Sequence, residues 1–162
     1  MKVNVYTDGA CSGNPGKGGY GIIMEWVGQP YIKEFSEGFR LTTNNRMELL
    51  AVIVALEQLK KEGIEVMIYS DSKYVVDSVE KGWVFNWLKK GFKDKKNADL
   101  WRRFLKVYKK HKVKFHWIRG HNEHPQNERC DQLAVKAAQR TKLHIDEAFE
   151  AQQYSGSGSL EL

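Results

Sequence analysis

Two stretches of the chain, VYTDGACSGNPG at residues 5–16 and IYSDSKYVV at residues 68–76, follow the same pattern. In each, an apolar run passes through a tyrosine and a hydroxyl residue and ends on an aspartate, Asp8 or Asp71. Side chains alternate along a strand, so each aspartate shares a face with the tyrosine two residues before it. If the two strands are parallel neighbours, both carboxylates emerge on one face at the carboxyl end of the sheet, where open α/β sheets place their sites.

The remaining segments predict an α/β layered domain with a mixed sheet. Residues 20–26 and 31–40 flank a Gly-Gln-Pro turn, which is typical of a hairpin. Residues 9–19 are rich in glycine and are expected to form a loop. Helices and strands are expected to alternate after the hairpin, at residues 45–61, 65–70, 72–79, 82–90, 98–110, 112–118 and 127–142.

The charge of the chain is unevenly distributed. The net charge is +6, and residues 81–119 carry 14 Lys and Arg against two acids, whereas the remainder carries 12 against 18. A basic lobe on an acidic body indicates a polyanionic partner, although a solvated basic face has the same composition.

Composition also bears on the compartment. The longest apolar run, residues 49–56, is far shorter than the ~18 residues that a membrane span needs, so no membrane partner is expected. Met1 leads directly into a predicted strand, and the chain has two cysteines, so we expect no signal peptide, reduced thiols and a cytoplasmic protein.

Two further acids lie on predicted helices that face the sheet. Glu48 belongs to an otherwise apolar helix stripe, and Asp131 flanks the apolar stripe of the last helix. Each acid also has a simpler interpretation: Asp71 as a helix cap, Glu48 as the partner of Asn45 in a capping box, and Asp131 as compensation for a helix dipole. Four converging carboxylates would instead make a hard oxygen site that suits Mg²⁺ or Mn²⁺. Two such ions activate a water and stabilise the leaving oxygen of a phosphodiester.

Two other patterns suggest different sites and are less well supported. Residues 16–21 read G-x-G-x-x-G, but they open a hairpin and not a helix, so nucleotide binding is not favoured. His121, His124 and Cys130 suggest zinc, but no fourth ligand follows at the spacing of a zinc finger. A histidine of this loop instead suits proton transfer near a metal site.

The motifs of the chain resemble those of the type 1 ribonuclease H family in its bacterial form (ribonuclease HI), over about residues 3–142. The matching segments are YTDGACSGNPG, TTNNRMEL, YSDSKYV, a tryptophan-rich basic segment and GHNEHPQNERCDQLA, in the order and spacing of the family. The resemblance implies a ribonuclease H-like α/β fold, with a five-stranded mixed sheet flanked by helices and a basic helical protrusion.

The activity implied by this resemblance is hydrolysis of the RNA strand of RNA–DNA hybrids by two-metal-ion catalysis, which leaves 5′-phosphate and 3′-hydroxyl ends. The implied cofactor is Mg²⁺, with Mn²⁺ as a substitute. The alternatives are a non-catalytic hybrid-binding module of the same fold and a nuclease that cuts duplex DNA.

The resemblance also assigns roles to residues. The metal-binding acids match Asp8, Glu48, Asp71 and Asp131, with Asp8 expected to bridge the two ions, and the proton-handling histidine matches His121. The residues that match contacts with the hybrid are Cys11, Asn14, Thr43, Asn44, Asn45, Lys73, Trp83, Lys89, Lys90, Phe92 and Lys93. Two of these positions depart from the family, because Lys73 stands where many relatives have glutamine and Phe92 where some have tryptophan.

The expected organisation is a catalytic domain at residues 1–142, with the basic protrusion at residues 81–110 inside it. Residues 143–162 are expected to form a tail that is partly helical or disordered. The expected partner is an RNA–DNA hybrid, and a monomer with no obligate protein partner is expected because no exposed apolar face is evident.

Overall fold

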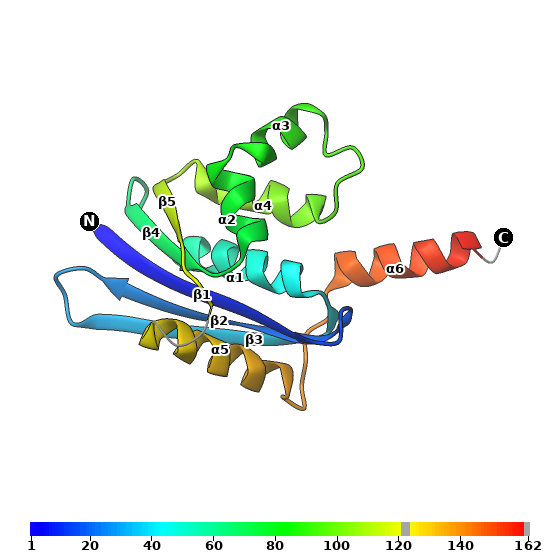
Figure 1. Cartoon of the computed structure of the whole chain (residues 1–162), viewed down its shortest axis with the longest axis horizontal. Helices are drawn as coiled ribbons and strands as arrows, with labels where there is room; N and C mark the ends of the chain where they lie inside the picture. Colours follow the sequence, from blue (N-terminus) through cyan, green and yellow to red (C-terminus); the bar gives the residue numbers. More distant parts are fainter. Residues whose placement is uncertain (121–123, 161–162) are drawn as a thin grey trace.

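The computed structural model describes residues 1–120 and 124–160, and its centre is a five-stranded sheet with the order β3-β2-β1-β4-β5 (Figure 1). The strands are β1 (Lys2–Ser12), β2 (Gly16–Trp26), β3 (Tyr31–Thr42), β4 (Glu65–Ser70) and β5 (Lys112–Trp117). The helices are α1 (Asn44–Glu57), α2 (Lys73–Glu80), α3 (Trp83–Lys89), α4 (Ala98–Tyr108), α5 (Pro125–Ala138) and α6 (Glu147–Leu160). The expected α/β fold with a five-stranded mixed sheet is confirmed.

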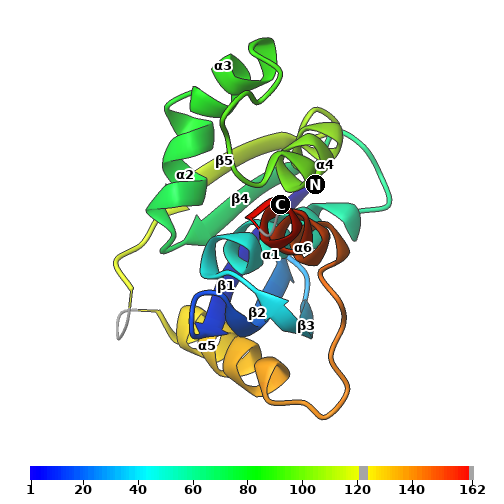
Figure 2. The same ribbon diagram turned by 90° about the vertical axis from the view of Figure 1, so that its right-hand side faces the viewer.

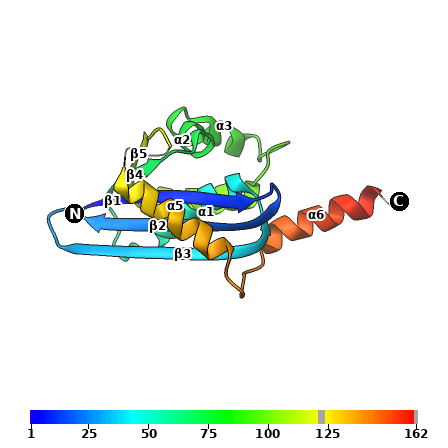
Figure 3. The same ribbon diagram turned by 60° about the horizontal axis from the view of Figure 1, so that its bottom comes forward.

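The helices cover the two faces of the sheet unequally. Helix α5 lies across β1, β2 and β3 on one face (Figure 3), whereas α1 and α4 lie on the opposite face, with α2 and α3 beside them (Figure 2). Most of the core lies between α1 and the sheet, and α1 is buried around most of its circumference. This burial fixes α1 at the centre of the molecule and therefore fixes any side chain that it directs at the sheet.

Strands β1 and β4 are parallel neighbours, as the two tyrosine–aspartate motifs predict. In their register Tyr6 pairs with Tyr69, and the two rings stack with their centroids 4.8 Å apart. Asp8 and Asp71 each follow two residues later on the same side. The register of this strand pair therefore brings the two aspartates together.

The expected loop at residues 9–19 is wrong, because β1 and β2 run through most of it and leave only residues 13–15 as a turn. The glycines serve helix packing in place of loop flexibility. A Cβ atom at Gly19 or Gly21 would collide with backbone carbonyls of α5, so the absence of side chains lets that helix approach the sheet closely.

Two helices end a full turn earlier than their patterns predict. Helix α1 stops at Glu57 and not at residue 61, and α5 stops at Ala138 and not at residue 142. Among the described residues, no helix combines the length and apolar character that crossing a membrane requires.

The segment after α5 returns to the body of the protein. The backbone of His144 bonds to Gly38 and Arg40 of β3, at 2.9 and 3.0 Å, and α6 then projects away from the sheet (Figure 1). Between these two features, Asp146 is buried and accepts hydrogen bonds from Arg46 Nε and Nη2 at 2.7 and 2.9 Å. The C-terminal segment is therefore tied to the first turn of α1.

Candidate active site

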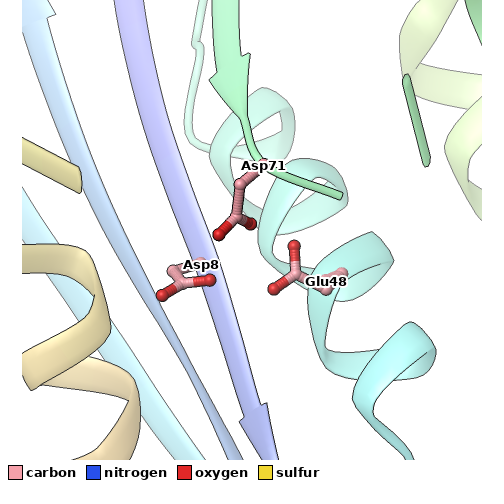
Figure 4. Close-up of side chains that lie close together, drawn as sticks. All are labelled: Asp8, Glu48 and Asp71. Atoms are coloured by element: carbon pink, nitrogen blue, oxygen red, sulfur yellow. The ribbon is translucent and has the colours of Figure 1, made fainter. Parts of the chain in front are cut away.

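Three carboxylates converge at the carboxyl end of the central strands (Figure 4). Asp8 comes from β1, Glu48 from α1 and Asp71 from the end of β4, and one oxygen of each lies within 4.8 Å of the others. Asp8 and Glu48 are buried, and Asp71 is half-buried. Acids that are 40 and 23 residues apart in sequence therefore form one cluster.

Glu48 takes no part in capping its helix, because another residue does so, and its side chain points into the cluster. Thr43 is the N-cap of α1, and its Oγ1 accepts a hydrogen bond from the Arg46 backbone at 3.2 Å, so the capping box with Asn45 is not formed. Glu48 Oε1 instead accepts a hydrogen bond from the Gly9 backbone N–H at 2.6 Å. Its other oxygen, Oε2, is buried without a hydrogen-bond partner among the described residues.

Gly9 makes this arrangement possible. A Cβ atom at this position would lie 2.6 Å from the backbone nitrogen of Glu48 and 2.8 Å from the carbonyl carbon of Met47. The same N–H contacts Asp8 Oδ1 at 3.0 Å, so one backbone donor orients two carboxylates. The close approach of α1 to β1 therefore depends on glycine.

Asp71 also has no capping role. The N-cap of α2 is Ser72, whose hydroxyl accepts a hydrogen bond from the Val75 backbone at 3.2 Å. The Asp71 side chain turns toward Asp8 (Figure 4), and its backbone carbonyl accepts a hydrogen bond from the indole of Trp117 at 3.1 Å. The strand end therefore presents this carboxylate to the cluster.

Asp131 lies beside the cluster and not within it. It lines the same pocket as the three clustered acids, and its charge raises the pKa of Asp8. Helix α5 begins at Pro125, so Asp131 lies beyond the first turn, where an acid compensates the helix dipole most effectively. Its position fits a fourth acid facing Asp8 better than a dipole role.

The surroundings of Asp8 and Glu48 disfavour their charged forms. The pKa of Asp8 is raised to about 7, chiefly by burial; the charges of Asp71 and Asp131 also raise it, and the interaction with Glu48 lowers it. Burial and the neighbouring Asp8 raise the pKa of Glu48 well above its usual value. Without a cation, the pair therefore retains protons that isolated acids would have lost at neutral pH.

The donor set fits a divalent cation. The ligand atom that each of the three acids offers is a carboxylate oxygen, the ligand type that Mg²⁺ and Mn²⁺ prefer. The buried Glu48 Oε2 is an acceptor that a cation would satisfy. The pocket above the acids has a volume of about 530 Å³, which leaves room for a phosphate group beside the ions.

The structure places several expected substrate contacts around this pocket. Cys11, Asn44, Asn45 and Lys73 line it directly. Asn14 stands behind Asn44, because its Oδ1 accepts a hydrogen bond from the Asn44 backbone at 3.1 Å. Thr43 caps α1, as described above.

The other expected contacts lie on the protrusion, where the structure separates surface residues from core residues. Trp83, Lys89, Lys90 and Lys93 are exposed. Phe92 is only 4% exposed, and its ring packs against the Arg102 guanidinium at 4.8 Å. The loop therefore folds the Phe92 ring into the core of the protrusion, and the expected contact of this residue with the hybrid stays a prediction.

His121 lies outside the described residues, so its expected role in proton transfer stays a prediction. Sequence reasoning also missed four residues that line the pocket, Gly9, Ala10, Ser72 and Tyr74. A glycine inside a strand, directly after a candidate acid, was an available signal for Gly9. Neither Tyr74 nor the nearby Trp117 carries a signal of this kind, since aromatic residues at element ends are common.

Comparisons with known proteins identify the family of the chain. A family model described as RNase H matches residues 1–139. A ribonuclease H of Desulforamulus reducens is 56% identical over 150 residues, covering 90% of this chain and 92% of that protein. The crystal structure of LC9-RNase H1, a type 1 RNase H with the type 2 active-site motif, matches with a TM-score of 0.76 at 35% identity, covering 85% of this chain and 72% of that one. LC11-RNase H1 in complex with an RNA/DNA hybrid matches with a TM-score of 0.58 at 26% identity, covering 91% and 99%.

The match to the family model spans most of the chain, and the relatives are similar over nearly their whole length. Fold, acid cluster and sequence similarity lead to one conclusion: the chain belongs to the RNase H family and is a type 1 ribonuclease H.

Proposed function

We propose that this ribonuclease H hydrolyses the RNA strand of RNA–DNA hybrids in the pocket around Asp8, Glu48, Asp71 and Asp131. The products are expected to carry 5′-phosphate and 3′-hydroxyl ends. The observation that carries the assignment of the site is the convergence of three carboxylates, one of which has a buried oxygen without a partner among the described residues.

The proposed cofactor is Mg²⁺, with Mn²⁺ as a substitute. Asp8, Glu48 and Asp71 would hold one cation, and Asp8 with Asp131 would hold a second. Bound divalent cations supply a nucleophilic water at neutral pH and stabilise negative charge on the leaving oxygen.

The protein's own groups prepare the pocket for this chemistry. The Gly9 N–H holds Glu48 Oε1, so Oε2 stays directed at the cluster for a cation or a ribose 2′-hydroxyl. The raised pKa values of Asp8 and Glu48 mean that a cation displaces protons when it binds. His121 is proposed to transfer protons during attack or product release.

Binding of the hybrid is proposed to extend from the pocket to the protrusion. Cys11, Asn44 and Asn45 on the pocket wall would contact the hybrid near the cleaved bond. The exposed lysines of the protrusion, Lys89, Lys90 and Lys93, would neutralise phosphates, with Trp83 beside them. The hybrid bound to LC11-RNase H1 supports this partner by similarity.

A cleavage assay with four labelled substrates tests the proposal: the RNA–DNA hybrid, single-stranded RNA, duplex RNA and duplex DNA. We expect nicking of the hybrid's RNA strand alone, in Mg²⁺ or Mn²⁺ and not in EDTA. Asp8→Asn should abolish cleavage and preserve hybrid binding, whereas Asp77→Asn, a matched change in α2 outside the pocket, should cleave normally.

Two results would overturn the proposal. Hybrid binding without cleavage by the wild-type protein in Mg²⁺ would indicate a binding module, and cleavage of duplex DNA would indicate a different nuclease. We further propose that the enzyme acts as a cytoplasmic monomer, and light scattering of the purified protein tests the oligomeric state.

A further inference from the structure

Trp117 lies where β5 meets the acid-bearing end of β4. It is the last residue of β5, pairs with Ser70 in the sheet and is 38% exposed. Its indole N–H donates to the Asp71 carbonyl at 3.1 Å, and the next residue, Ile118, donates its backbone N–H to Ser70 at 2.9 Å. The end of β5 therefore holds the backbone segment from which Asp71 projects.

The same indole also contacts a cation. Lys73 Nζ lies 4.8 Å from the centroid of the Trp117 ring, within the range of a cation–π interaction. Lys73 is exposed and lines the acid pocket, so its ammonium group stands at the rim where a phosphate would arrive. An unsupported lysine would lose much rotamer freedom on binding, and a ring beneath it reduces that loss.

Trp117 thus contacts two neighbouring residues of the pocket, the acid Asp71 and the base Lys73. Through its N–H it contacts the backbone of an acid, and through its ring it contacts a cation two residues later. The remaining charge at this rim is acidic, because the pocket also holds Asp8, Glu48 and Asp131. A lysine there would be drawn toward the carboxylates unless another group held it outward.

We propose that Trp117 is a positioning residue: its ring holds the Lys73 ammonium at the pocket rim to receive a phosphate of the hybrid, and its N–H fixes the Asp71 carbonyl. This inference rests on the proposed function of the pocket. It assigns Trp117 no direct contact with the hybrid.

The test separates the two roles by using two substitutions. Trp117→Leu removes both the ring and the donor, whereas Trp117→Phe keeps an aromatic face and removes the donor only. Tyr31→Leu is the matched control, because Tyr31 is also an exposed ring near a lysine, with Lys33 Nζ at 5.4 Å, at the opposite end of the strands. Thermal unfolding of each variant establishes that it is folded.

Affinity for the hybrid is measured in EDTA, so the readout does not depend on cleavage or on metal. We expect Trp117→Leu and Lys73→Met each to weaken binding by about three- to fivefold. The double variant should bind no more weakly than Lys73→Met alone, because the ring acts through the lysine. Tyr31→Leu should bind like the wild type.

Steady-state cleavage then tests the N–H. Trp117→Phe should keep the KM and the EDTA affinity of the wild type and lower kcat by about three- to tenfold, because one hydrogen bond that orients Asp71 is lost. A role limited to stability would leave kcat unchanged at temperatures where the variant is folded.

Three results would overturn the inference. Additive losses in the double variant would mean that Trp117 contacts the hybrid itself. Wild-type affinity in Trp117→Leu would show that Lys73 needs no support, and an unchanged kcat in Trp117→Phe would remove the role of the N–H. Failure of the proposed function would look different: the wild type would bind the hybrid and not cleave it.

Discussion

Helix α1 carries two buried charged side chains, Arg46 and Glu48, whose surroundings are opposite. Arg46 is 1% exposed and donates to both oxygens of Asp146 and both oxygens of Asp99, at 2.7 to 2.9 Å. Glu48 is 3% exposed and shares its pocket with three other acids, and Lys73 at the rim is the one opposite charge among the described residues that line it. Two charged side chains that are equally buried on one helix therefore differ in the charges around them: Arg46 faces acids of opposite charge, and Glu48 also faces acids, which carry like charge.

This difference indicates that the Arg46 cluster has a structural role and the Glu48 cluster a functional one. Despite its burial, Arg46 has a raised pKa because both carboxylates favour its charged form, and the pKa of Asp99 is lowered by the same contacts against the effect of burial. The Glu48 cluster has raised carboxylate pKa values, so its charged form is unfavourable without a cation. The compensated Arg46 cluster joins α1, α4 and the C-terminal segment, and the acid cluster is suited to bind a ligand.

The largest expected difference is in catalysis. Glu48→Gln should lower hybrid cleavage by about 10³-fold or more, because an amide cannot replace a carboxylate ligand. Asp146→Asn, the equivalent change in the compensated cluster, should keep cleavage within about tenfold of the wild type at a temperature where it is folded. Initial cleavage rates in Mg²⁺ measure both, and equal losses would contradict the separation.

The second expected difference is in stability, where Asp146→Asn is the damaging change and Glu48→Gln is not. Asp146→Asn should lower the free energy of unfolding by about 3 kcal/mol, because Arg46 loses a charged partner in a buried site. Glu48→Gln should raise the free energy of unfolding of the metal-free enzyme at pH 8 by about 1–2 kcal/mol, because it removes an unfavourable charge. Urea denaturation in EDTA measures both changes, and a destabilised Glu48→Gln variant would show that this acid has a structural role as well.

The third difference is in pH dependence. The folded pKa values of Asp8 and Glu48 are raised, so the folded state binds more protons than the unfolded state between the two pKa values. The contribution of Asp8, whose folded pKa is about 7, is therefore fully present below about pH 4 and is lost as the pH rises through about 7. Asp8→Asn should flatten this decline in EDTA, measured by urea denaturation from pH 5 to pH 8; an unchanged slope would assign the decline to other groups.

The smallest expected effect concerns an exposed ion pair on the same C-terminal segment. Arg40 and Glu150 form a two-bond pair at 2.8 and 2.9 Å, but the Arg40 side chain is 55% exposed. Arg40→Gln should leave the free energy of unfolding within experimental error of the wild type, because water screens the pair. A loss as large as that of Asp146→Asn would falsify the view that burial makes the Arg46 cluster important.

Local pattern was sufficient to predict the central strands and their acids. The alternation of Tyr6 and Asp8, and of Tyr69 and Asp71, defines a common face, and a parallel pairing is enough to bring the faces together. Glu48 was predicted for a similar reason: the apolar stripe of its helix faces the sheet, so an acid within that stripe faces the sheet as well.

Long-range pairing and packing were not predictable in this way. Nothing in the first turn of α1 shows that Arg46 pairs with an acid 100 residues later. Gly19 was assigned to a loop because close packing of α5 leaves no local pattern in the strand that it covers. Phe92 lies in a lysine-rich stretch, which is typical of a surface that contacts nucleic acid. Only the fold of the protrusion places its ring inside.

The distance along the chain between Arg46 and Asp146 has a consequence for synthesis on the ribosome. Translation proceeds from the N-terminus, so Arg46 emerges a hundred residues before its second carboxylate partner. Until Asp99 emerges α1 can pack on the sheet only with an unpaired guanidinium group, and from then until Asp146 emerges the group has one of its two carboxylate partners. Emergence of Asp146 is thus the event that allows the first turn of α1 to reach its final stability.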